Sequence, residues 1–107
     1  MDNLVFGDIV LLKFPFSDGI HFKKRPALLI RDTHDGDIIV CRITSKIHNS
    51  PFDVKLEEWK ESGLKLPSVI RIHKIATMER EMAERKIGTI NKKAEIKIKQ
   101  IIGNLVE

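Results

Sequence analysis

Arginine and hydroxyl side chains stand at two points of the chain where a strand is expected to begin or end. Arg25 precedes Pro26, and a residue before proline is pushed towards extended backbone, so Arg25 should lie in a stretched segment. Thr44 and Ser45 follow an apolar run. Paired hydroxyls at a strand end can bind a phosphate oxygen, or they can cap a turn. The arginine fork also matches phosphate geometry, so both sites are candidates for phosphate binding.

A second pair of candidates lies further along the chain. Arg71 and His73 are two residues apart in an apolar run, and on a strand they would project to the same face. A cation is costly in such a strand unless it faces a groove or a partner. The alternative is that this face of the strand is solvent-exposed, as one face of an antiparallel sheet often is.

The segment from Phe16 to Arg25 interleaves aromatic and basic side chains. Aromatic rings stack on unpaired bases and cations hold phosphates, so the segment is a candidate RNA-binding loop. It is equally consistent with a solvated loop whose phenylalanines fold back on the core. The residues concerned are Phe16, His21, Phe22, Lys23 and Lys24.

No motif for metal binding or covalent catalysis accompanies these residues. The histidines, at positions 21, 34, 48 and 73, have no paired helical spacing and no cysteine partners. There is no glycine-rich phosphate loop and no nucleophile elbow. RNA cleavage needs neither, because the ribose 2′-hydroxyl attacks the adjacent phosphorus and the protein aligns the attack, stabilises charge and moves protons. We therefore predict chemistry without a metal or cofactor.

The composition predicts one compact domain over residues 1–107. A net charge of +4 and a pI of about 9.3 lean mildly towards a polyanionic partner. The single cysteine, Cys41, lies in an apolar run and is expected to be a buried core thiol. The apolar run at residues 9–12 is too short for a membrane span or signal core, which predicts a cytoplasmic protein without membrane association.

The elements expected to position these residues are mostly short strands. The hydrophobic pattern predicts strands over 8–14, 25–30, 38–44, 52–56, 68–78 and 86–90, with a loop over 16–24 and a tight turn at 35–37. One helical turn is expected over 57–61. Asn91 is a candidate N-cap for a C-terminal helix. Its apolar stripe would be Ala94, Ile98, Ile101, Ile102 and Leu105.

Alternation within two strands predicts which side chains face outwards. In residues 52–56 the polar positions Asp53 and Lys55 are expected to point outwards. In residues 68–78 two faces are expected, one with Val69, Arg71, His73 and Ile75, the other with Ile70, Ile72, Lys74 and Ala76. Together the elements predict a mainly β fold closed by a C-terminal helix, arranged as a small, partly open barrel that protects strand edges.

The chain resembles the MazF/PemK family of toxin endoribonucleases from bacterial toxin–antitoxin pairs. Four segments carry the resemblance in order along most of the chain. They are Gly7-Asp8-Ile9-Val10, Arg25-Pro26-Ala27-Leu28-Leu29-Ile30, Ile43-Thr44-Ser45 and Pro67-Ser68-Val69-Ile70-Arg71-Ile72.

The resemblance implies an SH3-like barrel of the MazF/CcdB type, a homodimer, and sequence-specific, metal-independent cleavage of single-stranded mRNA that leaves a 2′,3′-cyclic phosphate. It also implies a cognate antitoxin whose tail folds onto the toxin, with DNA contacted only through that complex. Arg25 and Thr44 match the catalytic arginine and threonine of the family. Ser45, Arg71, His73 and His21 are, from their residue types, further candidates for a catalytic or phosphate-binding role. Some relatives carry an acid where this chain has His73, and His21 does not align cleanly with their loop histidine.

Two other functions are compatible with the same fold. Toxins resembling CcdB bind DNA gyrase and do not cleave RNA, although the matches at Arg25 and Thr44 argue against that branch. A plain nucleic-acid-binding barrel would bind RNA in a salt-dependent way and release no products.

Overall fold

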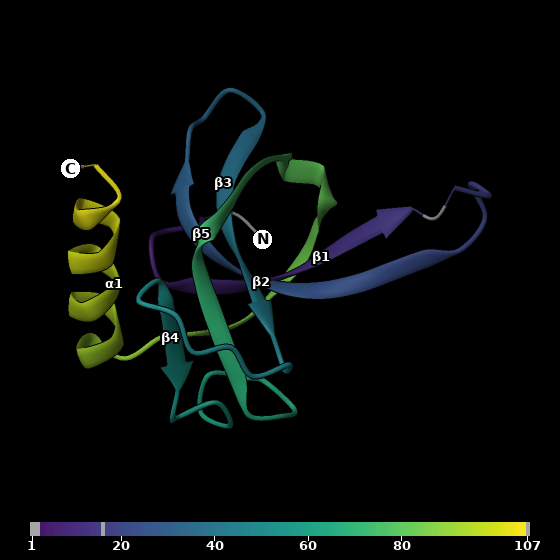
Figure 1. Ribbon diagram of the computed structural model, residues 1–107. Helices are drawn as coiled ribbons and strands as arrows, with labels where there is room; N and C mark the ends of the chain where they lie inside the picture. The colour runs from purple at the N-terminus through teal and green to yellow at the C-terminus, as the bar shows by residue number, and fades with distance from the viewer. Residues whose placement is uncertain (1–2, 16, 107) are drawn as a thin grey trace.

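The computed structural model describes residues 3–15 and 17–106, so Phe16 of the predicted RNA-binding loop lies outside the described residues. Within these ranges the chain forms six strands and one C-terminal α-helix (Figure 1), as the sequence predicts. The strands are β1 (Asp8–Pro15), β2 (Phe22–Asp32), β3 (Asp37–Thr44), β4 (Asp53–Leu56), β5 (Ser68–Glu79) and β6 (Ala83–Thr89). A short 3-10 helix, η1 (Arg80–Met82), joins β5 to β6, and α1 (Lys92–Asn104) follows β6.

The strands form one antiparallel sheet in the order β4-β5-β3-β2-β1-β6. β1 and β2 pair from Ile9 opposite Leu28 as far as Pro15 opposite Phe22. They therefore make a long hairpin that projects from the body of the molecule (Figure 1). The prediction of a loop over residues 16–24 is wrong for residues 22–24, because Phe22, Lys23 and Lys24 already pair with β1.

The alternation expected along β5 is interrupted by a bulge. Arg71 lies opposite Arg42, but Ile75 lies opposite the next residue of β3, Cys41, so β5 has three extra residues in between. An odd number of extra residues exchanges the two faces of a strand. Arg71 consequently shares a face with Ala76, and the prediction that it shares one with Ile75 is wrong.

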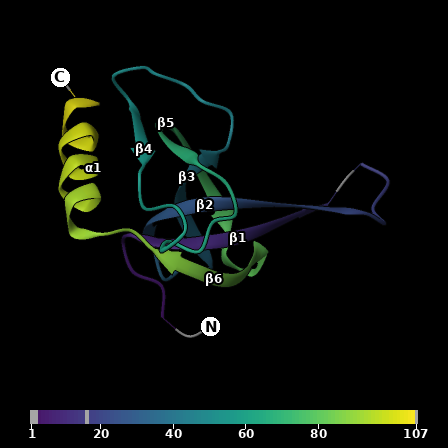
Figure 2. The same ribbon diagram turned by 90° about the horizontal axis from the view of Figure 1, so that it is seen from below.

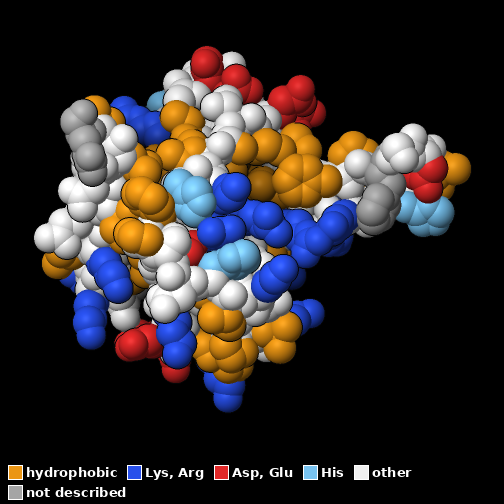
Figure 3. Space-filling model, in the orientation of Figure 1, with side chains coloured by type: hydrophobic (Ala, Val, Ile, Leu, Met, Phe, Trp, Pro, Cys, Tyr) orange, Lys and Arg blue, Asp and Glu red, His pale blue; other side chains and the backbone are white. Residues whose placement is uncertain are grey.

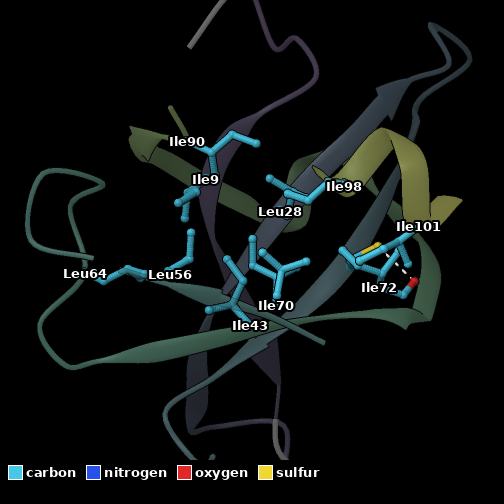
Figure 4. Packing of buried hydrophobic residues seen from close by; sticks show 12 residues of the cluster. Ile9, Leu28, Ile43, Leu56, Leu64, Ile70, Ile72, Ile90, Ile98 and Ile101 are labelled. Atoms are coloured by element: carbon cyan, nitrogen blue, oxygen red, sulfur yellow. Dashed lines mark hydrogen bonds between the residues drawn. The ribbon is translucent and has the colours of Figure 1, made fainter. Parts of the chain in front are cut away.

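The core consists of two clusters on opposite faces of the central strands. The first contains Ile9, Leu28, Cys41 and Ile70, all fully buried, and α1 covers it. The side chains of α1 that enter it are those of Ile98 and Ile101 (Figure 4). The second cluster takes the alternate residues of β1–β3, which are Val10, Leu12, Ala27, Leu29, Ile38 and Val40, and adds Leu4 and Ala83. Because both faces are buried, β1–β3 are rich in apolar residues on both sides.

Local signals place the helix and the turns. The Asn91 side chain accepts a hydrogen bond from Ala94 N at 2.8 Å, which confirms the predicted N-cap. Gly36 has a φ of 94° at the turn between β2 and β3, where a side chain would be strained. The helical turn expected over 57–61 corresponds to a run of hydrogen-bonded turns that is too short to count as a helix, in which Ser62 N donates to Glu58 O, four residues earlier, at 3.1 Å.

The loop after β4 crosses the opposite edge of the sheet. A Cβ added to Gly88 of β6 would lie 1.9 Å from Ser62 O, and one added to Gly63 would lie 1.9 Å from Ile87 O. The two backbones touch here, and the crossing can be followed in Figure 2. The contact brings the β4 end of the sheet against β6, so the sheet curls towards a barrel although, within the described residues, no ladder joins these edges. Among the same residues, no helix is long and apolar enough to cross a membrane.

Candidate functional site

Two grooves meet where β2 passes the end of β3. The first, here called the apolar groove, has a volume of about 400 Å³ and a floor of Leu12, Phe14, Ala27, Val40, Ala76 and Met78. The second, here called the open-end groove, has a volume of about 520 Å³ and lies between β2–β3 and the loop that carries Gly63 to Leu66. Both are lined by the same four residues, Arg25, Pro26, Ile43 and Thr44.

Strand pairing explains why Arg25 and Thr44 come together. Ala27 lies opposite Arg42 in the β2–β3 ladder. Continuing that register by two residues places Arg25 opposite Thr44, and residues opposite each other in an antiparallel pair project to the same face. The Arg25 side chain is exposed and Thr44 is half-buried. A guanidinium and a hydroxyl thus reach the boundary between the two grooves, here called the shared rim, from neighbouring strands.

The two hydroxyls at the end of β3 are not equivalent. Thr44 Oγ1 accepts a hydrogen bond from Lys46 N at 3.1 Å, which is the turn-capping role considered for this position. An accepting hydroxyl keeps its own hydrogen, so it can still donate to a phosphate oxygen. Ser45 is exposed and lines only the open-end groove.

The charge around both grooves is positive. The apolar groove is lined by Lys23, Arg25, Arg42 and Lys74, and the open-end groove adds Lys24, Lys65 and Arg85. Among the described residues that line the two grooves, none is an Asp or a Glu. Figure 3 shows this arrangement as a band of Lys and Arg side chains that runs towards the projecting hairpin, beside a patch of hydrophobic side chains. Such a surface suits an anion with apolar or aromatic parts.

Arg71 and His73 lie beside the grooves and do not line them. Arg71 Nε donates to Asp53 Oδ1 at 2.9 Å, and the Asp53 side chain is only 2% exposed. The prediction that Asp53 points outwards is therefore wrong, because its place opposite Arg71 in the β4–β5 ladder turns it inwards. His73 packs on Phe52 with ring centroids 5.3 Å apart, and its Nδ1 is buried without a hydrogen-bond partner in the described part of the chain.

His21 and Phe22 lie near the tip of the β1–β2 hairpin, away from both groove linings. Asp18 accepts from His21 Nδ1 at 2.7 Å and from the backbone N–H groups of Ile20 and His21, and the His21 hydrogen bond is the main reason that the pKa of Asp18 is lowered. Phe22 is half-exposed and carries Lys13 Nζ 4.3 Å from its ring centroid. The hairpin tip thus presents an aromatic ring, a cation and an imidazole to solvent.

His48 is a further titratable group that motif spacing does not single out. It is half-buried in the connection between β3 and β4. Burial lowers the pKa of His48 below its usual range, and the charge of Arg71 lowers it further, more than nearby Asp53 raises it. The imidazole is therefore neutral at pH 7. A loop position without periodicity offers no sequence signal for this environment.

One family model matches nearly the whole chain. The family, described as PemK-like, MazF-like toxins of type II toxin–antitoxin systems, matches over residues 6–106. The chain belongs to this family. The match confirms the predicted resemblance, and it covers every residue of both groove linings. No curated protein matches this toxin by sequence.

Solved structures share the fold of this toxin at low identity. A MazE–MazF structure from Deinococcus radiodurans matches with a TM-score of 0.79 and 19% identity, covering 96% of this chain and 95% of the other. An endoribonuclease in complex with its cognate antitoxin, from a mycobacterial species, matches with a TM-score of 0.76 and 14% identity, covering 95% of this chain and 93% of the other. The Mycobacterium tuberculosis toxin MazF-mt6 matches with a TM-score of 0.71 and 22% identity, covering 89% of this chain and 93% of the other. These matches confirm the MazF-like fold.

For the MazF-like toxin described here, the cross-strand ion pair bears on the departure at position 73. The family resemblance leads us to expect an acid two residues after Arg71, where this chain has His73. The structure gives Arg71 a carboxylate from a different strand, because Asp53 of β4 lies directly opposite it. Sequence reasoning missed this acid because the two residues are 18 positions apart and only sheet pairing joins them.

Proposed function

We propose that this toxin is an endoribonuclease that cleaves single-stranded RNA at short recognition sequences. The observation that carries the proposal is the shared rim, where Arg25 and Thr44 line both grooves from opposite strands. A scissile phosphate bound at this rim would have nucleotides on either side of it in the two grooves. Unstacked bases suit the apolar floor, and the surrounding cations suit the phosphates.

The proposed reaction begins with attack of the ribose 2′-hydroxyl on the adjacent phosphorus. The P–O5′ bond breaks, the 2′-hydroxyl loses its proton and the 5′-oxygen gains one, so the products are a 2′,3′-cyclic phosphate and a 5′-hydroxyl. Arg25 stabilises the negative charge on the phosphate oxygens, and Thr44 donates a hydrogen bond that orients them. Neither role requires a metal ion.

The remaining predicted residues have supporting roles in this proposal. Ser45 can donate to the same phosphate from the open-end side. Lys23 and Lys24 contact flanking phosphates along β2, and Phe22 offers a ring to a base. A proton-carrying role for His21 or His73 stays a prediction, tested by the acid limb of the pH–rate profile in His21→Gln and His73→Gln.

The test is cleavage of a long unstructured RNA with mapped product ends, in the presence of EDTA. Wild-type protein should give discrete 5′-hydroxyl ends, and Arg25→Ala should cleave about a hundred- to a thousandfold more slowly. Thr44→Val removes the hydroxyl at similar volume and should also cut slowly. Arg31→Ala is the matched control, because Arg31 is an exposed arginine of the same strand that lines neither groove.

Two outcomes would overturn the nuclease assignment, and a third would overturn its metal independence. If folded wild-type protein leaves the RNA intact, the proposed nuclease activity is refuted. Inhibition of DNA gyrase by the same sample would then indicate the CcdB-like alternative. Salt-dependent RNA binding without products would indicate a binding barrel. Cleavage that EDTA abolishes would refute metal independence.

We also propose that the toxin is a homodimer neutralised by a cognate antitoxin. Two of the similar structures are complexes with an antitoxin. The apolar groove combines an apolar floor with four cations, which suits an antitoxin tail that is both acidic and apolar and folds on binding. Competition between an acidic antitoxin peptide and RNA tests this, and light scattering tests the dimer.

A further inference from the structure

The carboxylate of Asp53 is buried, charged and next to the proposed RNA site. Its side chain is 2% exposed although it lies on β4, an edge strand of the sheet. Burial raises the pKa of Asp53, but hydrogen bonds from Arg71 and Ser50 outweigh burial and bring it to about 2. The carboxylate is therefore ionised at any working pH. A buried charge is costly unless it is paired and hydrogen-bonded, so the contacts around it matter.

Those contacts join three parts of the chain. Asp53 Oδ1 accepts from Arg71 Nε on β5, and Oδ2 accepts from Ser50 N in the β3–β4 connection, each at 2.9 Å. The same connection is bonded by Phe52 N to Ser50 Oγ at 3.2 Å, and Ile72 N donates to Phe52 O at 2.9 Å. One carboxylate thus holds both the Arg71 side chain and the backbone that follows β3.

Arg71 is held beside a second arginine that belongs to the apolar groove. Arg42 lies directly opposite Arg71 in the β3–β5 ladder, so the two side chains share a face. Arg42 is exposed, lines the apolar groove and, among the described residues, makes no ion pair. Two adjacent guanidinium groups repel each other, and without Asp53 the Arg71 side chain would swing away from Arg42.

The bond to Asp53 leaves most of the Arg71 donors for another anion. A guanidinium has five N–H groups, and this bond uses only the one on Nε. In the part of the chain that the structure describes, no acceptor is bonded to Nη1 or Nη2 of Arg71, and the side chain is 15% exposed. Arg42 is two residues from Thr44, which is about 7 Å along a strand and comparable to one step of an extended RNA backbone.

We propose that Asp53 is a positioning residue that fixes Arg71 beside Arg42, so that the two guanidinium groups bind the RNA phosphate next to the scissile one. This inference rests on the proposed function, because it presumes that RNA lies across Arg25 and Thr44. Asp53 itself does not contact RNA in this arrangement. Its effect on RNA passes through Arg71.

The experiment measures the Kd of a short RNA that contains the mapped cleavage site, with 2′-deoxyribose at the attacking nucleotide to prevent cleavage. Asp53→Asn should bind about five- to tenfold more weakly than wild type. Arg71→Ala should bind comparably weakly, and the slope of log Kd against log salt should fall by about one phosphate contact. The double variant should bind no more weakly than Arg71→Ala, since Asp53 acts through Arg71.

The matched control is Asp32→Asn, because Asp32 forms a similar pair with Arg80 Nε at 3.0 Å, its side chain is 6% exposed, and it lies outside both groove linings. It should bind RNA within about twofold of wild type even if its Tm falls. Should Asp53→Asn fail to fold, Arg71→Lys replaces it: lysine keeps the charge but cannot make the Nε bond, and the same weakening is expected.

A folded Asp53→Asn or Arg71→Lys protein that binds RNA as tightly as wild type overturns the inference. An Asp53→Asn effect of equal size in the Arg71→Ala background also overturns it, because the carboxylate then acts by another route. Wild-type protein that neither cleaves nor binds RNA refutes the proposed function instead, so the two failures are distinguishable.

Discussion

The contact between Gly88 and the loop after β4 allows a sharp test of the fold. A Cβ at position 88 would lie 1.9 Å from Ser62 O, whereas ordinary Cβ contacts begin at 3.4 Å, so Gly88→Ala must separate the two backbones by 1.5 Å. Gly88 has no positive φ, so the contact alone causes the effect. Overpacking against unyielding atoms costs about 1–3 kcal/mol or more, and we expect about 3 kcal/mol here because both partners are backbone.

The assay is urea unfolding at equilibrium, with Gly103→Ala as the matched control. A Cβ at Gly103 meets nothing within 4 Å, and the residue lies in α1, where alanine is favoured over glycine. The control should be unchanged or more stable by up to about 1 kcal/mol. Because Gly63 and Leu64 line the open-end groove, Gly88→Ala should also weaken RNA binding. A free energy of unfolding for Gly88→Ala within about 0.5 kcal/mol of wild type, on the scale of a neutral surface change, would refute the reasoning.

Three further measurements test the account of stability. Asn91→Ala removes the N-cap of α1 and should lower the free energy of unfolding by about 1 kcal/mol, whereas an unchanged value would mean that the cap bond contributes nothing. Ile98→Ala leaves a cavity at a fully buried position and should cost about 3 kcal/mol in the same urea assay, and a loss below 1 kcal/mol would contradict the packing of α1 on the sheet. Asp53 has a folded pKa of about 2 against 3.8 in the unfolded chain, so its ionised form adds about 2 kcal/mol that is present above pH 4 and lost as pH falls through 2. The difference in free energy of unfolding between wild type and Asp53→Asn should therefore shrink as the pH is lowered from 7 to 2. A difference that stays constant over this range would exclude the linkage.

Features fixed by local chemistry could be predicted from the sequence. The Asn91 cap, the turn at Gly36 and the apolar strands at β1, β3 and β5 depend on residues within a few positions of one another. The burial of Cys41 follows from its apolar run, and burial raises the pKa of its thiol to about 12. These are the parts of the fold in which sequence patterns and structure agree.

Features fixed by pairing between distant strands could not be predicted. Lys23 and Lys24 look like loop residues because nothing in the segment shows that β1 continues to Pro15 opposite them. Asp53 looks like an outward residue because its partner, Arg71, belongs to another strand. The grooves themselves depend on the register that brings β2 alongside the end of β3, so the sequence identifies Arg25 and Thr44 as candidates but not their shared rim.

The three extra residues of β5 invert the alternation of its two faces between the first and second halves of the strand. Upstream of them, odd-numbered positions such as Arg71 point to the groove side; downstream, the even-numbered Ala76 and Met78 do so. Because pairing with β3 sets the two faces, an even number of extra residues at positions 72–74 would let the upstream parity continue, whereas the three that are present exchange it. The length of this short stretch therefore sets whether odd- or even-numbered positions of downstream β5 face the groove side. When residues of a related toxin are aligned with β5, the face on which each side chain lies has to be assigned separately before and after residues 72–74.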